Sequence, residues 1–169
     1  MPGLATSSAR WLKFRVNTDS RGSLVALESG KSLPICIKRV FYLFDNENAA
    51  IRGRHAHKYS RQVMISLHGS CIVGLDDGRT RRSVNLENGR VGLYVDRMVW
   101  TELLLSPGSI VLVLTDTFYD EADYIRDYKE FLRKAPNSVS SMVLRDSNCE
   151  DAGSKAKRRV YSKRAYADK

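Results

Sequence analysis

The chain has 169 residues, 43% of them hydrophobic, and a net charge of +9, which fits one domain able to bury its own core. It contains no run of 18 apolar residues, and its first residues, MPGLATSSAR, include no apolar signal segment. These features predict a cytoplasmic protein rather than an integral membrane protein.

Short β-branched and aromatic runs dominate the first two thirds of the chain. In chain order they cover residues 23–28, 35–45, 61–78, 82–89, 90–108 and 109–120. Asp77-Gly78 and Asn88-Gly89 are pairs that favour hairpin turns, and Ser-Pro-Gly-Ser at 106–109 is a third turn. Turns at intervals of roughly 10 to 15 residues, without a long helical period between them, predict an antiparallel sandwich or barrel.

One helix is predicted, at residues 120–134. Its apolar residues recur at spacings of three and four: Tyr124, Ile125, Tyr128, Phe131 and Leu132. The sequence therefore predicts an all-β domain over residues 11–133 that ends in a C-terminal helix. Residues 1–10 are expected to be flexible, and residues 134–169 to form a disordered basic tail.

The charge is concentrated in this tail. Ten of the 28 Lys and Arg residues, but only four of the 19 Asp and Glu residues, lie from Arg133 to Lys169, a net charge of +6. The segment is polar and rich in serine, so it lacks the apolar surface to fold alone. We expect a solvated tail rather than a nucleic-acid-binding segment, because short basic runs are a weak signal.

The three cysteines, Cys36, Cys71 and Cys149, show no C-x-x-C spacing. Cys36 and Cys71 stand in apolar runs, which is typical of small buried side chains. Reduced thiols are therefore expected, in agreement with a cytoplasmic protein.

All three histidines fall within residues 51–69, and His55 and His57 are separated by one alanine. In a strand, these two side chains point to the same face. The spacing resembles the first metal-binding motif of cupins, but Gln62 stands where that motif has glutamate. The segment where a later histidine would be expected, residues 92–105, contains none. Two imidazoles and one amide are a poor ligand set, so no metal is predicted.

The histidine pair could also serve in packing or in proton transfer. A single histidine would favour packing, and His68, which precedes a glycine at a strand end, is interpreted as structural. Two imidazoles on one face can serve as acid and base on neighbouring carbons, as an enediol mechanism requires. Arg52 and Tyr42 could then hold a developing oxyanion or a phosphate.

Several motifs occur in an order that identifies a family. They are DSRGSLVALE (19–28), IKRVFYLFD (37–45), RGRHAHK (52–58), GSCIVGLDDG (69–78), GLYVDRMVW (92–100) and YDEADYIRDYKEF (119–131). Over residues 15–133 the chain closely resembles the bacterial sugar-nucleotide 3,4-ketoisomerases, the WxcM-like or FdtA-type proteins, which act on dTDP-4-oxo-6-deoxyglucose.

The resemblance implies a cupin-like jelly-roll or barrel, a homodimer, and an isomerase that uses no cofactor. Its product would be a dTDP-3-oxo-6-deoxyhexose for deoxyaminosugars of surface polysaccharides or antibiotic glycosides. The HAH motif then supplies His55 and His57 as the proton-transfer pair, with His57 favoured as the base. The remaining site residues implied are a catalytic Tyr42 and the substrate-binding residues Arg52, Arg21, Gly22, Thr101, Trp100 and Lys58.

Thr101 departs from the family pattern, in which a histidine often follows the tryptophan. Threonine does not titrate near neutral pH, so the configuration of the product at C4 stays open. Two alternatives also stay open: a non-catalytic sugar-nucleotide-binding module, and a 3,5-epimerase acting on the same substrate.

Overall fold

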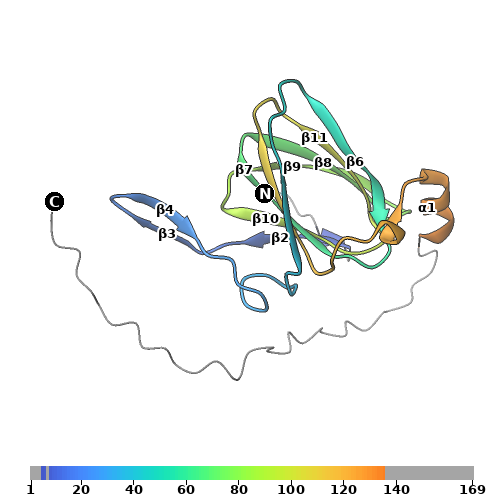
Figure 1. Ribbon diagram of the computed structural model, residues 1–169, viewed down its shortest axis with the longest axis horizontal. Coiled ribbons are helices and arrows are strands. Elements are labelled where there is room, and N and C mark those ends of the chain that lie inside the picture. The colour runs from blue at the N-terminus through green and yellow to red at the C-terminus, as the bar shows by residue number, and fades with distance from the viewer. Residues whose placement is uncertain (1–4, 7, 136–169) are drawn as a thin grey trace.

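Two antiparallel sheets pack face to face in the computed structural model (Figure 1), which describes residues 5–6 and 8–135. From residue 136 onward, the predicted tail and Cys149 lie outside the described residues. The first sheet has the strand order β1-β2-β10-β7-β12-β5, and the second has the order β13-β6-β11-β8-β9. A separate ribbon is formed by β3 and β4. The element bounds are β1 Ala5–Thr6, β2 Ala9–Lys13, β3 Val16–Asp19, β4 Gly22–Val25, β5 Arg39–Leu43, β6 Ala50–His57, β7 Gln62–His68, β8 Ser70–Asp76, β9 Arg81–Glu87, β10 Val91–Val95, β11 Trp100–Leu105, β12 Ile110–Thr115, η1 Glu121–Asp123, β13 Tyr124–Ile125 and α1 Tyr128–Lys134.

From β5 onward the chain passes repeatedly from one sheet to the other. β5, β7, β10 and β12 belong to the first sheet, and β6, β8, β9 and β11 belong to the second. Such crossing between facing sheets is the jelly-roll arrangement. The predicted all-β, cupin-like jelly roll with a C-terminal helix is therefore confirmed. Its sheets remain two layers and do not close into a barrel.

Of the three predicted turns, only Asp77-Gly78 closes a hairpin, in which Asp76 pairs with Arg81. Asn88 adopts a positive φ of 53°, as a tight turn requires, but the strands on either side of it belong to different sheets. The turn at residues 106–109 likewise joins β11 in one sheet to β12 in the other. The hairpin expected at Asn88-Gly89 is thus wrong, because a turn motif fixes a reversal of the chain but not the pairing partner.

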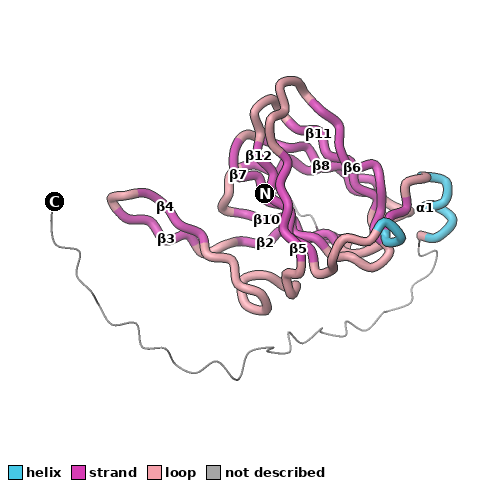
Figure 2. The backbone as a smooth tube through the Cα atoms, in the orientation of Figure 1, coloured by secondary structure: helices cyan, strands magenta, loops and turns pink. Residues whose placement is uncertain are grey.

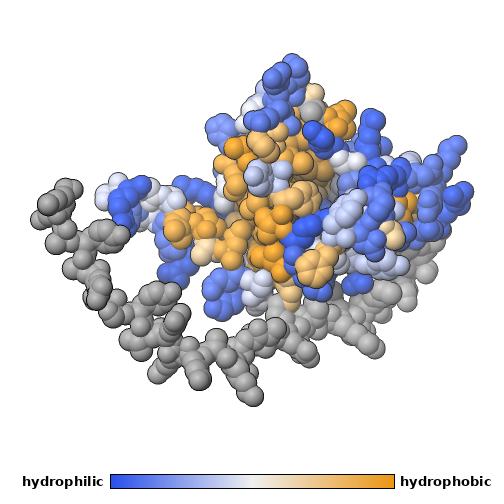
Figure 3. All heavy atoms as spheres, viewed as in Figure 1, coloured by the Kyte–Doolittle hydropathy of each residue, from blue (hydrophilic) through white to orange (hydrophobic). Residues whose placement is uncertain are grey.

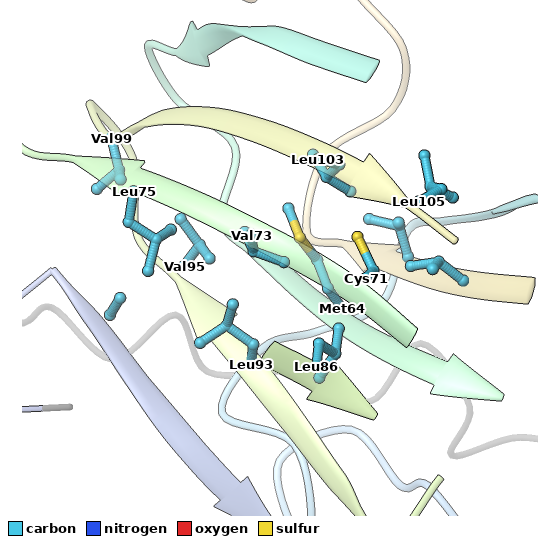
Figure 4. Close-up of a cluster of buried hydrophobic side chains, with 13 residues drawn as sticks. Met64, Cys71, Val73, Leu75, Leu86, Leu93, Val95, Val99, Leu103 and Leu105 are labelled. Carbon is cyan, nitrogen blue, oxygen red and sulfur yellow. The ribbon is translucent and has the colours of Figure 1, made fainter. Parts of the chain in front are cut away.

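The main core lies between the two sheets and follows the alternation of side chains along each strand (Figure 4). Met64 and Leu93 enter it from the first sheet, and Val73 and Leu103 enter it from the second. A second cluster covers the outer face of the first sheet, where Leu33 and Ile35 pack with Val63, Ile65 and Leu114.

The predicted helix is only half right. Asp127 caps α1, because its side chain accepts a hydrogen bond from the amide of Glu130, and α1 then packs Phe131 against Ala56 and Trp100. The preceding residues form the short 3-10 helix η1 and then β13, which pairs with β6. Tyr124 and Ile125 match a helical spacing by coincidence, since sheet pairing determines their conformation.

The two described cysteines differ. Cys71 is a fully buried free thiol, as expected, and burial raises its pKa to about 11. Cys36 is only half-buried and takes part in a disulfide, so the expectation of a buried, reduced thiol is wrong for it.

Figure 2 shows the β3–β4 ribbon projecting from the body of the molecule. Asp19 of β3 pairs with Gly22 of β4 next to the tip. Arg21 folds back onto Asp19, with 2.6 Å between its Nη2 atom and Oδ2 of the carboxylate. Among the described helices, none is long and apolar enough to span a bilayer.

Candidate active site

The histidine pair lies at a bulge in β6. Thr101 of β11 pairs with His55, but the next residue of β11 pairs with Gly53, so Arg54 has no partner in the register. Gly53 and Arg54 have φ values of 80° and 56°. A Cβ atom on Gly53 would lie 2.7 Å from the carbonyl oxygen of Thr101, so only glycine fits this bulge.

Both imidazoles point into the space between the sheets. His55 is opposite Thr101 and His57 is opposite Tyr124, on the face of the second sheet from which Leu103 enters the core. Their ring centroids are 4.9 Å apart in an edge-to-face arrangement. The predicted common face of His55 and His57 is therefore confirmed.

A buried carboxylate holds His57. The Nδ1 atom of His57 lies 2.6 Å from Oδ2 of Asp123, and the Ser60 hydroxyl donates to the same oxygen at 2.5 Å. The amide of Tyr59 donates to the other carboxylate oxygen at 2.7 Å, and Ser60 also hydrogen-bonds to Thr117. Because an ionised carboxylate only accepts, His57 donates its Nδ1 proton and leaves Nε2 free for chemistry.

The protonation states agree with this geometry. Burial raises the pKa of the Asp123 carboxyl, but hydrogen bonds from Ser60, His57 and Tyr59 outweigh it, so the pKa lies below its usual value. Burial lowers the pKa of His57, and the hydrogen bond and charge of Asp123 offset this only in part. An ionised Asp123 beside a neutral His57 results.

His55 is held differently. Its Nδ1 lies 3.0 Å from the carbonyl oxygen of Gly53, an acceptor, so Nδ1 carries the proton and Nε2 is unprotonated. The ring is half-buried, whereas His57 is only 5% exposed. Burial lowers the pKa of His55 from 6.5 to about 4, and the Gly53 hydrogen bond opposes this effect. His55 is therefore a neutral imidazole at physiological pH, with a free acceptor nitrogen.

Aromatic rings extend the site from the histidine pair. The Tyr124 ring lies 4.9 Å from His55 and 4.5 Å from His57 between centroids, and Tyr119 lies 5.8 Å further along. Arg126 stacks over Tyr124 at 4.6 Å and pairs with Glu121. An apolar ring beside two proton-transfer groups is suited to a sugar ring, whose carbon-bound hydrogens pack on aromatic faces.

The structure brings only some of the predicted site residues to this place. Thr101 is buried beside His55, and its hydroxyl lies 3.4 Å from the His55 carbonyl oxygen. Lys58 follows His57 and donates from its ammonium to the carbonyl of Ala122. Thr101, His55 and His57 thus lie together, and Lys58 borders them through its contact with Ala122, the residue before Asp123.

Several other predicted residues lie elsewhere. Tyr42 is 59% exposed on the outer face of the first sheet, because its neighbours Phe41 and Leu43 face the core. Trp100 points away from the histidines and packs against Phe131.

Arg52 is exposed, but it pairs with Leu103 and therefore lies on the same face of the second sheet as His55, two positions along β11 from Thr101. Arg21 and Gly22 lie at the tip of the projecting ribbon. The arginines whose charges act on the His57 imidazole are instead Arg39 and Arg126.

Three residues of the site are not predicted from the sequence: Asp123, Tyr124 and Arg39. The first two lie in a segment whose apolar spacing predicts a helix, so a partner strand for β6 could not be recognised there. In the part of the chain that the structure describes, no three His, Cys, Asp or Glu side chains come together as a metal-ligand set. Gln62, at the position of the cupin glutamate, is buried.

Comparison with known proteins connects this geometry to a reaction. The family model described as "FdtA: WxcM-like, C-terminal" matches residues 7–136. The TDP-4-oxo-6-deoxy-alpha-D-glucose-3,4-oxoisomerase of Aneurinibacillus thermoaerophilus is 47% identical over 121 residues, which cover 71% of this chain and 87% of that protein.

Solved structures agree. A 3,4-ketoisomerase from Helicobacter canadensis is 44% identical with a TM-score of 0.72, and the match covers 74% of this chain and 95% of that one. A His-to-Asn variant of the 3,4-ketoisomerase QdtA from Thermoanaerobacterium thermosaccharolyticum, solved with TDP-4-keto-6-deoxyglucose, is 33% identical. Its TM-score is 0.74, and the match covers 78% of this chain and 96% of that one. A dTDP-4-dehydrorhamnose 3,5-epimerase from Bacillus anthracis is only 19% identical, with a TM-score of 0.63 and coverage of 72% and 80%, and shares the fold alone.

Proposed function

Because the chain belongs to the FdtA-type, WxcM-like family of sugar-nucleotide 3,4-ketoisomerases, we propose that it converts TDP-4-oxo-6-deoxyglucose into a TDP-3-oxo-6-deoxyhexose. The observation that carries this proposal is the 47% identity with an oxoisomerase of that specificity. The reaction moves one hydrogen from C3 to C4 and the hydroxyl proton from the C3 oxygen to the C4 oxygen, so it needs two proton-transfer groups and no oxidant.

The two histidines divide these transfers. The C4 ketone acidifies the C3 hydrogen, which a base removes to give a 3,4-enediolate. His55 suits the role of base, since it is the more exposed imidazole and keeps Nε2 unprotonated. His57, which is hydrogen-bonded to Asp123, suits the transfer of the hydroxyl proton. The Asp123 carboxylate stabilises the imidazolium that forms transiently during this transfer. The sequence alone favours His57 as the base, whereas burial and hydrogen bonding favour His55.

The proposed chemistry is independent of metal ions. Two imidazoles held in fixed tautomers by Gly53 and Asp123 supply the acid and the base that an enediol route requires. A product with a 3-oxo group is also the substrate that an aminotransferase needs to make a 3-amino sugar. We therefore place the protein in deoxyaminosugar biosynthesis.

Proton NMR of the purified protein mixed with TDP-4-oxo-6-deoxyglucose and EDTA tests the function. New 3-oxo sugar signals are expected, and their coupling constants will report the C4 configuration that Thr101 leaves open. Unchanged sugar signals that only broaden or shift would mean a binding module without turnover. In D₂O, hydrogen exchange at C3 and C4 is expected, whereas exchange at C3 and C5 would indicate an epimerase.

The projecting ribbon supports a homodimer. An isolated two-stranded ribbon is marginally stable in water, and this one leaves Leu24 60% exposed. Val40, Tyr42 and Phe44 of the β5 region are also more than half exposed on the outer face of the first sheet. Figure 3 shows apolar side chains gathered in the middle of this view. We propose that a second copy covers this apolar surface and the ribbon.

Sedimentation equilibrium of the full chain is expected to give a dimer at micromolar concentration. Leu24→Asp, which places a charge on the exposed ribbon, should shift the equilibrium toward monomer. A wild-type monomer at this concentration would contradict the assembly.

A further inference from the structure

Arg39 lies near the histidine pair and carries a buried donor that no described residue satisfies. Its Nε is fully buried and has no hydrogen-bond partner, and no ion pair joins the guanidinium to the described residues. Two other arginines near the site are paired, Arg61 with Asp116 and Arg126 with Glu121. Buried donors in folded proteins are almost always satisfied, so an unpaired guanidinium points to a ligand that supplies the acceptor.

The strand register directs Arg39 into the site. Arg39 of β5 pairs with Thr115 of β12, which pairs in turn with Gln62 of β7. Phe41, two residues further along β5, packs against the core between the sheets. Arg39 therefore shares the inward face with Phe41, toward the second sheet that carries His55 and His57.

Two aromatic side chains restrict the position of the Arg39 guanidinium. Its Cζ lies 5.1 Å over the Phe41 ring and 5.5 Å over the Tyr119 ring. Tyr119 contacts Tyr124, which contacts both imidazoles, so these rings connect Arg39 with the histidines. The positive charge of Arg39 also lowers the pKa of His57.

From this placement we infer that Arg39 is a further catalytic residue, which binds the sugar oxygen that becomes negative in the 3,4-enediolate. The inference rests on the proposed function. In the reaction, the C3–H bond breaks, its proton goes to an imidazole, and the electron pair ends on the C4 oxygen. Arginine stays protonated at every working pH, so it stabilises this oxyanion without competing for the proton. This is the role that the sequence predicts for Arg52.

Two variants of Arg39 test the inference, with Arg90→Gln as the matched control. Arg90 is exposed and lies just before the first residue of β10. The opposite end of β10, at Val95, is the end that pairs with Gln62. Arg39→Gln is expected to lower kcat about 10²- to 10³-fold, as the loss of one oxyanion donor does elsewhere. Arg39→Lys keeps the charge but loses the planar guanidinium, so its kcat should lie between that of Arg39→Gln and that of the wild type. The dissociation constant of TDP, measured by calorimetry, should stay within about twofold. C3 hydrogen exchange in D₂O should slow in parallel with kcat.

A diphosphate anchor would behave differently. Wild-type kcat with weaker TDP binding and a raised KM in either variant would overturn the inference. If Arg39→Gln does not fold, Arg39→Lys decides, because a wild-type kcat in this variant also overturns it. A wild-type enzyme that fails to convert the sugar would overturn the proposed function itself, which separates the two failures.

Discussion

Replacing His55 by asparagine is expected to lower kcat by about 10²- to 10⁴-fold, the usual contribution of one general acid–base group. Asparagine can keep the hydrogen bond to the Gly53 carbonyl through its amide, but it has no nitrogen lone pair with which to accept the C3 proton. NMR turnover of TDP-4-oxo-6-deoxyglucose measures the effect. The melting temperature should change little, because the half-buried ring has no other hydrogen bond in the described residues.

His68→Asn is the matched control. His68 is exposed at the end of β7, opposite Ile110, so this substitution should leave kcat unchanged.

His57→Asn, like His55→Asn, should lower kcat. It should retain part of the C3 hydrogen exchange in D₂O, which His55→Asn should lose. The reverse pattern of exchange would assign the base to His57.

The pH profile checks His55 independently. A histidine with a folded pKa of about 4 and an ordinary value of 6.5 is neutral in the free enzyme down to about pH 4. The acid limb of kcat/KM should therefore lie well below 6.5. Between pH 6.5 and 4 the unfolded chain binds this proton and the folded chain does not, so acidification across this window should reduce the free energy of unfolding. An acid limb at pH 6.5 would contradict the lowered pKa of His55.

Alternation along strands made part of the site predictable. His55 and His57 had to share a face in any strand, and no knowledge of the fold was needed. Tyr42 shows the limit of the same rule. Phe41, Tyr42 and Leu43 are all apolar or aromatic, so the sequence does not indicate which set faces the core. Only pairing with β12 and packing between the sheets settle it.

Two further features depend on contacts distant in sequence. The bulge at Gly53 and Arg54 arises from the pairing of β6 with β11, and its extra residue places Arg52 and His55 on the same face of the sheet. Asp123 reaches His57 across 66 residues of chain. A carboxylate in a segment that has a helical apolar spacing gives no local signal that it will hold an imidazole.

Asp123→Asn tests this long-range contact and is expected to lower kcat by about 10²- to 10⁴-fold. The Tyr59 amide donates to Oδ1 at 2.7 Å, so the carbonyl oxygen of the new asparagine must occupy that position. Its NH₂ group then faces His57 and donates where the carboxylate accepted. His57 can accept only through a bare Nδ1, so its proton moves to Nε2 and blocks the nitrogen needed for catalysis.

The ¹⁵N shifts of the His57 ring will report this change of tautomer, which a merely structural role of Asp123 would not produce. Asp45→Asn is the matched control, because Asp45 is exposed at a φ of 56°, a conformation that asparagine accepts readily. Stability should fall by about 1–3 kcal/mol in Asp123→Asn, as expected when hydrogen bonds to a buried charge are lost. Full kcat together with a changed tautomer would show that His57 is not a proton carrier. An unchanged tautomer with low kcat would place the effect of Asp123 in its charge, which stabilises the His57 imidazolium, rather than in its hydrogen bond.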